Sequence, residues 1–417
     1  MSLKSAPDRE ALLAKCGENT LLIPHELVLY DFLTDSLQHR LLPRNANATD
    51  SLPPGIDAAL PECFAARFGM PHAIPLSQGR LAEAFVAKLL VRNGHVIPGS
   101  APFPTLRAHI ELSGGTYLPV VPAKAFDLWT RHPFKGDLDT EALEAVITRS
   151  NPEWVPFVCI EPCNNACGGQ PMSLANLKAV KEITDRFGIP LLLDACRVIE
   201  NAILIKESEP GQNAKSPWEI VREIFSLADI CVMSATKDFY TPIGGFLAFR
   251  KRELYEMSFD LLALLGDGLA HQAKTDLLSA LSNEEAILSL VQTKISNVRA
   301  LHEGLKCSYN VVEPAGGHAV VIDISGLELK PPFAVKNFLR HIYMQWGIRA
   351  SEHGMESSSA IRLAVPLCGV DQSTINQTVS GLRKAAEQAS LVPALKKVDE
   401  PAGFTGFMRA RFKCDNK

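Results

Sequence analysis

Two short stretches decide the fold: residues 188–201, GIPLLLDACRVIEN, and residues 228–238, ADICVMSATKD. In each, an almost wholly apolar run is followed directly by polar residues. Such a run is too short for a typical buried helix, and it is typical of a strand that is buried on both faces of a parallel sheet. We therefore predict an α/β fold in which helices cover both sides of a mostly parallel sheet.

The neighbouring segments continue this alternation. Ser173 is a suitable N-cap for a helix over residues 173–187, and Gly188 is suited to end it. Further helices are predicted over residues 81–92 and 139–148, the latter capped by Asp137 or Asp139. Strands are predicted over residues 154–160, 189–194, 228–233 and 246–249.

The pattern changes after residue 252. A long apolar stripe predicts a helix over residues 284–305, and shorter strands and helices follow it at 319–324, 337–346, 360–365 and 374–387. We predict three parts: an N-terminal arm, residues 1–50, that belongs to the small domain; a large domain, residues 51–305; and a small α+β domain, residues 306–417. The polar residues 44–51 are interpreted as arm or linker.

The composition narrows the class of protein. Of the 417 residues, 47% are hydrophobic and 21% are charged, and the formal net charge is −4. This balance excludes disorder as the main state and offers no basic surface for nucleic acid. We find no apolar run of membrane-spanning length and recognise no secretion leader, so we expect a cytoplasmic protein without nucleic-acid or membrane partners.

The ten cysteines are interpreted as reduced thiols, because a long chain with a large core does not depend on a disulfide framework. Cys163 and Cys167 are spaced like metal ligands, but no second Cys or His pair follows at ligand spacing. We therefore predict no metal site.

One carboxylate and one lysine end neighbouring predicted strands. Asp194 closes the apolar run of the first stretch, and Lys237 follows the apolar run of the second. Ligands of open α/β sheets bind beyond the carboxyl ends of the strands. Pyridoxal 5'-phosphate needs this pair, because a lysine amine forms its Schiff base and an aspartate keeps its ring nitrogen protonated. Taken singly, Asp194 as a helix cap and Lys237 as a surface lysine are the simpler interpretations.

Other residues could complete such a site. Residues 77–80, Ser-Gln-Gly-Arg, precede a predicted helix whose free N–H groups could hold a phosphate, and Ser234 could add a hydroxyl. Arg197 and Asn165 could approach the phenolic oxygen of the cofactor, although Arg197 could equally form a surface salt bridge with Glu200. Arg362, inside an apolar strand, could bind a substrate carboxylate or pair with Glu352 or Glu356.

Several segments resemble the β-eliminating lyases, the family of tryptophanase and tyrosine phenol-lyase, from about Pro75 to Pro366. The resemblance is carried by residues 133–137 (PFKGD), 165–178 (NACGGQPMSLANLK), 193–197 (LDACR) with 200–202 (ENA), and 233–238 (MSATKD). It implies fold type I of the pyridoxal-phosphate enzymes, like aspartate aminotransferase. It also implies a homodimer or homotetramer with active sites at the dimer interface.

The resemblance also implies roles for individual residues. Lys237 would carry the cofactor and Asp194 would hold its ring nitrogen, with Phe103 stacked on the ring. The phosphate would be held by four residues and the phenolic oxygen by two, and Arg362 would bind the substrate carboxylate with His318 nearby. Core packing is the simpler interpretation of Phe103 and His318. The six cofactor contacts are Gln78, Gly79, Arg80 and Ser234 for the phosphate and Asn165 and Arg197 for the oxygen.

Some family features are absent. Residues 48–60 contain neither the tyrosine that protonates the leaving group nor the glutamate that binds a monovalent cation. Thr236 stands where the family often has a second lysine. The phenol-lyases hold the leaving phenol with an arginine and a threonine, and His353 and Pro104 stand at the matching positions here. Tryptophanase has an aspartate near the position of Pro104, and this aspartate is absent as well. We expect a leaving group other than phenol or indole, with His353 as a candidate acid.

The sequence thus predicts a pyridoxal-phosphate lyase acting on an L-amino acid. Through an external aldimine and a quinonoid, it would eliminate or replace a β-substituent. Two alternatives stay open: an aminotransferase or another reaction on the same scaffold, and a catalytically inactive homologue that acts as a binding subunit.

Overall fold

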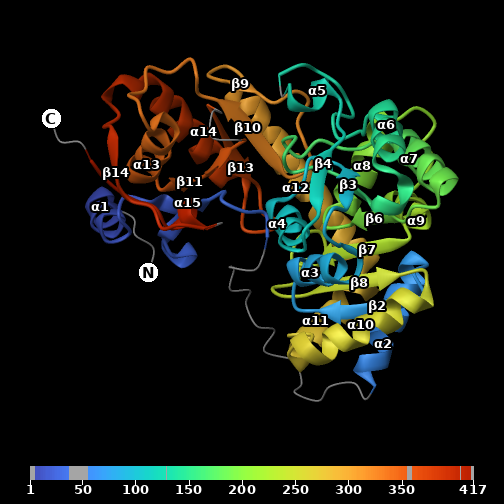
Figure 1. The fold of residues 1–417 in the computed structure, drawn as a ribbon. Coiled ribbons are helices and arrows are strands. Elements are labelled where there is room, and N and C mark those ends of the chain that lie inside the picture. Colours follow the sequence, from blue (N-terminus) through green and yellow to red (C-terminus); the bar gives the residue numbers. More distant parts are fainter. Residues whose placement is uncertain (1–4, 37–54, 128, 355–358, 404, 415–417) are drawn as a thin grey trace. The chain divides into compact units, whose positions relative to one another are not determined.

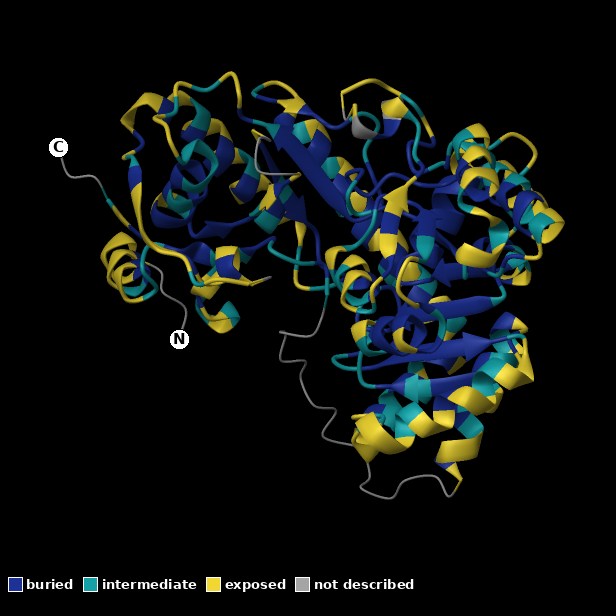
Figure 2. Ribbon diagram, viewed as in Figure 1, coloured by how far each residue is buried: buried dark blue, intermediate teal, exposed yellow. Residues whose placement is uncertain are grey.

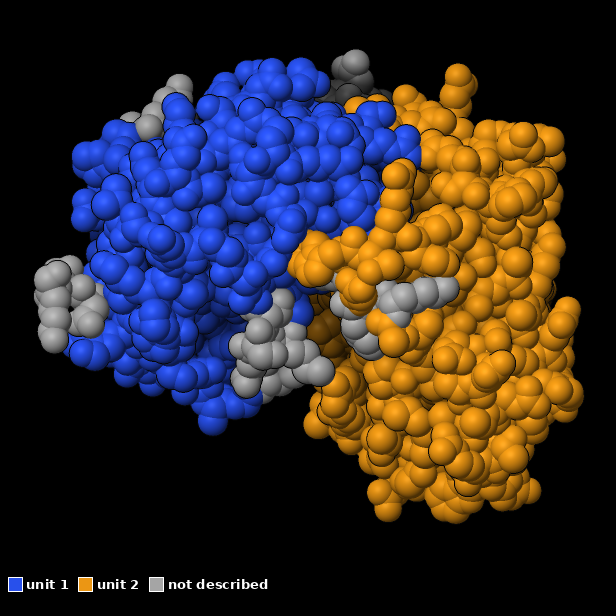
Figure 3. Space-filling view, turned by 90° about the horizontal axis from the view of Figure 1, so that it is seen from above, with its two compact units in different colours: residues 1–35, 294–417 blue, residues 36–293 orange. Residues whose placement is uncertain are grey.

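The structure is a computed structural model that describes residues 5–36, 55–127, 129–354, 359–403 and 405–414. The chain divides into two compact units, coloured in Figure 3. Unit 1 comprises Met1–Asp35 and Lys294–Lys417, and unit 2 comprises Ser36–Thr293. Among the described residues, no helix combines the length and the apolar character that crossing a membrane would need.

Unit 2 is built on a seven-stranded sheet with the strand order β2-β8-β7-β6-β5-β3-β4 (Figure 1). Strands β7, β6, β5, β3 and β4 lie side by side in this order, and each pair of neighbours is parallel. Only β8 is antiparallel to its two neighbours, β2 and β7. The mostly parallel α/β fold is therefore confirmed. The strands are β2 His72–Leu76, β3 Val96–Gly99, β4 Thr116–Pro119, β5 Val158–Ile160, β6 Leu191–Asp194, β7 Ile230–Ser234 and β8 Gly245–Phe249.

Both faces of this sheet are covered, so its central strands are buried throughout (Figure 2). On one face, Ile230, Val232 and Leu247 pack in an apolar cluster with Phe85 and Val86 of α3. On the other face, an aromatic group joins the sheet to helices α2 and α9. Its rings are those of Phe64, Phe68, Phe225 and Phe246. Two-sided burial explains why these strands have continuous apolar runs.

The helices of unit 2 begin and end at residues suited to those positions. Asp139 caps α6, and Ser173 caps α7, which ends at the left-handed Gly188 as predicted. Ser216 and Glu219 form a capping box at α9. The helices are α2 Ile56–Phe68, α3 Gly79–Leu90, α4 Pro104–Leu112, α5 Ala123–Phe126, α6 Thr140–Ser150, α7 Leu174–Phe187, α8 Val198–Ser208, α9 Pro217–Leu227, α10 Arg252–Leu265 and α11 His271–Ser282.

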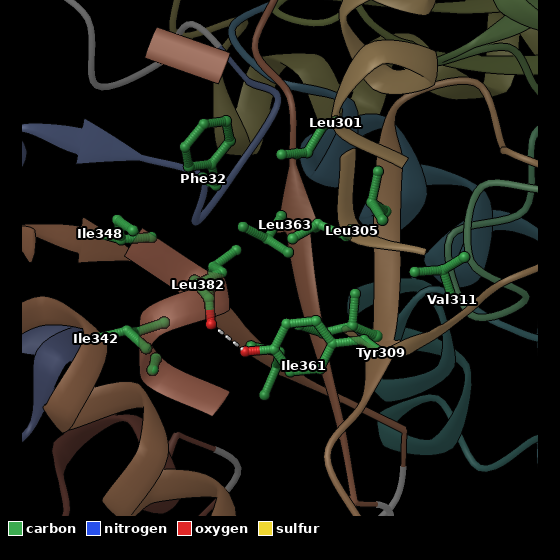
Figure 4. Close-up of a cluster of buried hydrophobic side chains, with 14 of the residues drawn as sticks. Phe32, Leu301, Leu305, Tyr309, Val311, Ile342, Ile348, Ile361, Leu363 and Leu382 are labelled. Carbon is green, nitrogen blue, oxygen red and sulfur yellow. Dashed lines mark hydrogen bonds between the residues drawn. The ribbon is translucent and has the colours of Figure 1, made fainter. Parts of the chain in front are cut away.

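Unit 1 contains a four-stranded sheet, β12-β13-β10-β9, whose pairs are antiparallel. Its core is the apolar cluster of Figure 4, where the only hydrogen bond drawn joins the Tyr309 hydroxyl to the Leu382 carbonyl. The strands are β9 Asn310–Val311, β10 Ala319–Asp323, β12 Ser351–His353 and β13 Ala360–Ala364. Two further pairs are β1 Tyr30–Asp31 with β11 Ile348–Arg349, and β14 Leu395–Asp399 with β15 Arg411–Cys414. The helices are α1 Ala6–Lys15, α12 Glu284–Leu305 (which starts in unit 2), α13 Ala334–Trp346, α14 Gln372–Glu387 and α15 Gly406–Arg409.

The structure differs from the sequence predictions in several places, of which three bear on the sheet and the division into units. Trp154 lies in a 3-10 turn, Pro152–Trp154, so the strand that was expected from residue 154 begins only at Val158. Strands β2, β3 and β4 were not predicted. The units divide at residues 35/36 and 293/294 rather than at 50/51 and 305/306, because Val298, Leu301 and Leu305 of α12 pack in the unit 1 core. The polar stretch 44–51 lies outside the described residues.

Candidate active site

Strand direction brings the candidate residues of unit 2 to one edge of the sheet. Strands β2, β3, β5, β6 and β7 point the same way, so the segments that follow them emerge at the same edge. In a doubly wound sheet this edge is where ligands bind. It receives the loop after β2 with Gly79, the segment after β3 with Phe103, Glu161 after β5, Asp194 at the end of β6, and Ser234 with Lys237 at the end of β7.

Asp194 is buried at this edge, with a side chain only about 5% exposed. Its Oδ1 accepts a hydrogen bond from the backbone N–H of Cys196 at 3.1 Å. The first free N–H groups of α8, those of Ile199 and Glu200, instead donate to Asp238 Oδ2 at 2.8 and 3.2 Å. The interpretation of Asp194 as the cap of the following helix is therefore wrong, because Asp238 fulfils that role.

Lys237 is half-buried, so the interpretation as a solvated surface lysine is also wrong. The Tyr240 N–H donates to the Lys237 carbonyl at 3.1 Å, and Tyr240 adopts a positive φ of 53° in this tight turn. The Lys237 ammonium lies 5.6 Å from the centroid of the Phe103 ring. The turn thus presents the amine beside an aromatic face, at the edge that also holds Asp194.

The Gln78-Gly79-Arg80 turn lies against the end of β7. A Cβ on Gly79 would lie 2.8 Å from Ser234 Cβ, so only glycine allows this approach. Gly245 of β8 lies between the two segments, and a Cβ there would lie 2.9 Å from the Gly79 nitrogen. The Ser234 hydroxyl is also hydrogen-bonded to Thr236 Oγ1 at 3.0 Å. The N-terminus of α3 and a serine hydroxyl therefore form one cradle suited to an anion.

Arg197 and Asn165 meet at a second buried carboxylate, Glu161. The Asn165 N–H donates to Glu161 Oε1 at 3.2 Å, and Arg197 Nη1 lies 3.9 Å from the same oxygen. Arg197 is about 4% exposed and Glu200 is fully buried, so any pair between these two residues would be buried and not on the surface. Burial and the nearby charge of Asp194 raise the pKa of Glu161, which Arg197 opposes.

Glu83 of α3 is a third buried carboxyl beside this edge. It accepts a hydrogen bond from the Thr105 hydroxyl. Burial, and then the charge of Asp194, raise the pKa of Glu83 to about 7, although Thr105 and the charges of Lys237 and Arg80 oppose the shift. Perturbed carboxyls that gather around one lysine are typical of a functional site.

The three predicted substrate-binding residues belong to unit 1, so their place beside this edge stays a prediction. Arg362 lies in β13 and its Nη2 donates to the Leu33 carbonyl at 3.4 Å. Its suggested partner Glu352 forms an ion pair with Lys336 at 3.0 Å, while Glu356 lies outside the described residues. His318, just before β10, is fully buried, and His353 ends β12 and is about 7% exposed.

The sequence of residues 57–359 matches the profile of the β-eliminating lyases. The chain belongs to the β-eliminating lyase family. It is 32% identical to a tyrosine phenol-lyase of Fusobacterium nucleatum, over 97% of this chain and 94% of that protein. It is 30% identical to a tyrosine phenol-lyase of Nostoc punctiforme, over 99% and 94% of the two chains.

Two solved structures with the same fold are pyridoxal-phosphate enzymes. A histidinol-phosphate aminotransferase of Sinorhizobium meliloti, in complex with pyridoxal 5'-phosphate, matches 91% of this chain and 94% of its own at a TM-score of 0.64 and 17% identity. A PLP-dependent aminotransferase of Streptococcus suis matches 87% and 94% at 0.65 and 18%. At these identities the likeness shows the fold alone, fold type I. The family of this chain and the fold that it shares with these enzymes together identify it as a pyridoxal-phosphate-dependent lyase.

The residues at the sheet edge fit this cofactor. The carboxylate of Asp194 ends β6, the amine of Lys237 follows the neighbouring β7, an aromatic ring lies beside the amine, and an anion cradle closed by Gly79 lies at the same edge. These are the groups that a protonated pyridine, an aldehyde and a phosphate need.

Sequence reasoning missed four residues of this candidate site: Glu83, Glu161, Asp238 and Gly245. A signal existed for Glu161, because it directly follows an apolar strand just as Asp194 does. A signal also existed for Gly245, the second glycine of a pair that opens a strand. Asp238 lies in the segment 233–238 that carries the resemblance, but only its contacts with α8 give it a role. Glu83 had no signal, because only tertiary contacts of α3 give it one.

Proposed function

We propose that this lyase removes a β-substituent from an L-amino acid whose leaving group departs without strong acid assistance, rather than phenol or indole. The observation that carries the proposal is the convergence of Asp194, Lys237 and the Gly79–Ser234 cradle on one edge of the sheet. Pyridoxal phosphate, when bound, withdraws electrons from the substrate Cα and makes its proton removable.

The residues of unit 2 would divide the work of binding and proton transfer. Asp194 would hold a proton on the ring nitrogen, and Lys237 Nζ would accept the proton from the substrate Cα. Phe103 would pack on the ring face. Asn165 and Arg197 would hold the phenolic oxygen, and the phosphate would bind in the cradle formed by Gln78, Gly79, Arg80 and Ser234.

Three residues of unit 1 would act on the substrate itself. Arg362, with its planar guanidinium, suits an α-carboxylate. His318 would lie near the substrate, and His353 would protonate the departing group. Loss of the Cα proton followed by cleavage of the Cβ–substituent bond, with hydrolysis, would release pyruvate, ammonia and the protonated leaving group. We also infer a cytoplasmic homodimer or homotetramer with active sites at the dimer interface.

The nature of the leaving group follows from side chains that the chain lacks. Residues 48–60 contain no tyrosine to protonate a phenol or an indole, and Pro104 has no hydroxyl to hold one. A thiol, a sulfoxide or a carboxylate is a better leaving group and needs less help from an acid. Such a substituent on alanine is therefore the substrate class that these residues favour.

Elimination of phenol from tyrosine is the second candidate, because the relatives compared above are named tyrosine phenol-lyases. The two candidates make opposite predictions for substrate preference. Elimination and transamination also differ, because only elimination releases pyruvate without a keto-acid acceptor.

The test is to load the purified protein with pyridoxal phosphate and to measure pyruvate release from single amino acids. We expect kcat/KM for S-alkylcysteines or O-acylserines to exceed that for tyrosine and tryptophan by at least about tenfold. Lys237→Ala is the control and should abolish both release and the visible band of the bound cofactor. A preference for tyrosine would establish the second candidate, and amino transfer to a keto acid without pyruvate would refute both.

A further inference from the structure

Glu161 is a buried carboxyl to which the proposed function gives no role. It directly follows β5, where Ile160 pairs with Leu193, so it lies next to Asp194 at the carboxyl edge of the sheet. Its side chain is about 5% exposed. Its backbone N–H donates to Ser100 Oγ at 3.0 Å, which fixes the start of the loop after the strand. A carboxyl this deeply buried needs partners.

The partners of Glu161 are N–H donors. Oε1 accepts from the Asn165 N–H at 3.2 Å and lies 3.9 Å from Arg197 Nη1, and Oε2 accepts from Asn164 Nδ2 at 3.2 Å. The Asn164 amide cannot simply reverse, because its Nδ2 also donates to the Ala101 carbonyl at 2.8 Å and its Oδ1 accepts from the Cys167 N–H at 3.0 Å. Two N–H donors and a guanidinium nitrogen at ion-pair distance suit an ionised carboxylate better than a protonated one.

The charges around Glu161 act in both directions, and a bound cofactor would change one of them. Burial and Asp194 raise the pKa of Glu161. A protonated ring nitrogen would offset the charge of Asp194 and so remove that repulsion, while Arg197 continues to favour the ionised form. The titratable and charged groups that act on Glu161 or are acted on by it come from several elements: Asp194, Arg197, Lys237, Tyr117, Cys159 and Cys167.

We propose that Glu161 is a positioning residue that holds Arg197 and Asn165 toward the phenolic oxygen of the cofactor and offsets the charge of Arg197, so that the cofactor–lysine linkage keeps its proton to higher pH. This inference rests on the proposed function, which brings Arg197 to that oxygen. Without the carboxylate, the positive charge of Arg197 would act more strongly on the linkage and favour loss of its proton.

The experiment is a pH titration of the visible absorption band of the loaded protein, without substrate. Glu161→Gln keeps the shape and the hydrogen-bond acceptor but removes the charge. We expect the midpoint of the titration to fall by about one pH unit, the size of shift that one nearby charge produces. Glu153→Gln, in the exposed turn before β5, is the matched control and should leave the midpoint unchanged.

A double variant separates the charge from other effects. In Glu161→Gln/Arg197→Gln both charges of the pair are removed, so the midpoint should return to within about 0.3 pH units of the wild type. Failure to return would show that Glu161 does not act through Arg197 and would overturn the proposal. Should Glu161→Gln not fold, Glu161→Asp withdraws the carboxylate from Arg197 and should lower the midpoint by less.

Two negative results have different meanings. A Glu161→Gln protein with a wild-type midpoint and only a lower unfolding temperature would make Glu161 a structural residue and refute this inference. A wild-type protein that binds no cofactor and shows no visible band would refute the proposed function instead.

Discussion

Buried carboxyls in the two units behave in opposite ways. In unit 1, Asp31 accepts from Arg349 Nε at 3.0 Å and Nη2 at 2.6 Å and also contacts His25. Burial alone would raise the pKa of Asp31, but these two partners lower it. In unit 2, burial and the charge of Asp194 raise the pKa of both Glu83 and Glu161. A carboxylate matched by a bidentate arginine stabilises the folded chain, whereas carboxyls with raised pKa values around one lysine are typical of a functional site.

Replacement of Asp194 tests the functional side of this comparison and should have the largest effect. Asp194→Asn keeps the shape but cannot hold a proton on the ring nitrogen, so kcat/KM for the best substrate should fall by about a thousandfold. The free energy of unfolding of the cofactor-free protein should not fall, because a like charge beside Glu83 and Glu161 is removed. Activity within tenfold of the wild type would contradict the role of Asp194.

Replacement of Arg349 tests the stabilising side. Arg349→Met leaves the Asp31 carboxylate buried without its main partner, so urea denaturation should show a loss of about 3 kcal/mol. Lys306→Met is the matched control in unit 1. Lys306 is exposed and pairs with Glu303 on the surface, so its loss should cost less than about 0.5 kcal/mol. Equal effects of the two variants would remove the distinction between the units.

The pH dependence of stability also tests the difference between the buried carboxyls of the two units, and here the smallest effect is expected. The pKa of Glu83 is raised from 4.5 to about 7 in the folded protein, so the unfolded chain loses this proton first. Below pH 4.5 the group has no effect on stability. Stability falls as pH rises from 4.5 to 7, and the full penalty remains above pH 7.

Glu83→Gln should therefore stabilise the cofactor-free protein at pH 8 by about 1 kcal/mol and change little at pH 4.5. Thermal unfolding at the two pH values measures this difference. Destabilisation at pH 8 would mean that the Thr105 hydrogen bond outweighs the buried charge.

Local patterns were enough to predict many of the elements. Ser173 and Gly188 bound α7 because a side-chain cap and a left-handed glycine act within one turn of the helix. The apolar runs of β6 and β7 predicted buried strands because two covered faces require apolar residues on both. β2 and β3 contain Pro75 and Pro98, which weaken a strand pattern, and the antiparallel direction of β8 has no local signal.

By itself, the sequence determined the α/β class, the strands that carry Asp194 and Lys237, and the resemblance to a family. These depend on residue type and on spacing over a few turns. Only the tertiary structure decided that Asp238 rather than Asp194 caps α8, that Gly79 and Gly245 close the cradle on Ser234, and that Glu83 and Glu161 are buried beside Asp194. Burial and charge depend on residues that are distant in the chain and meet only when the strands pair, so no local pattern contains them.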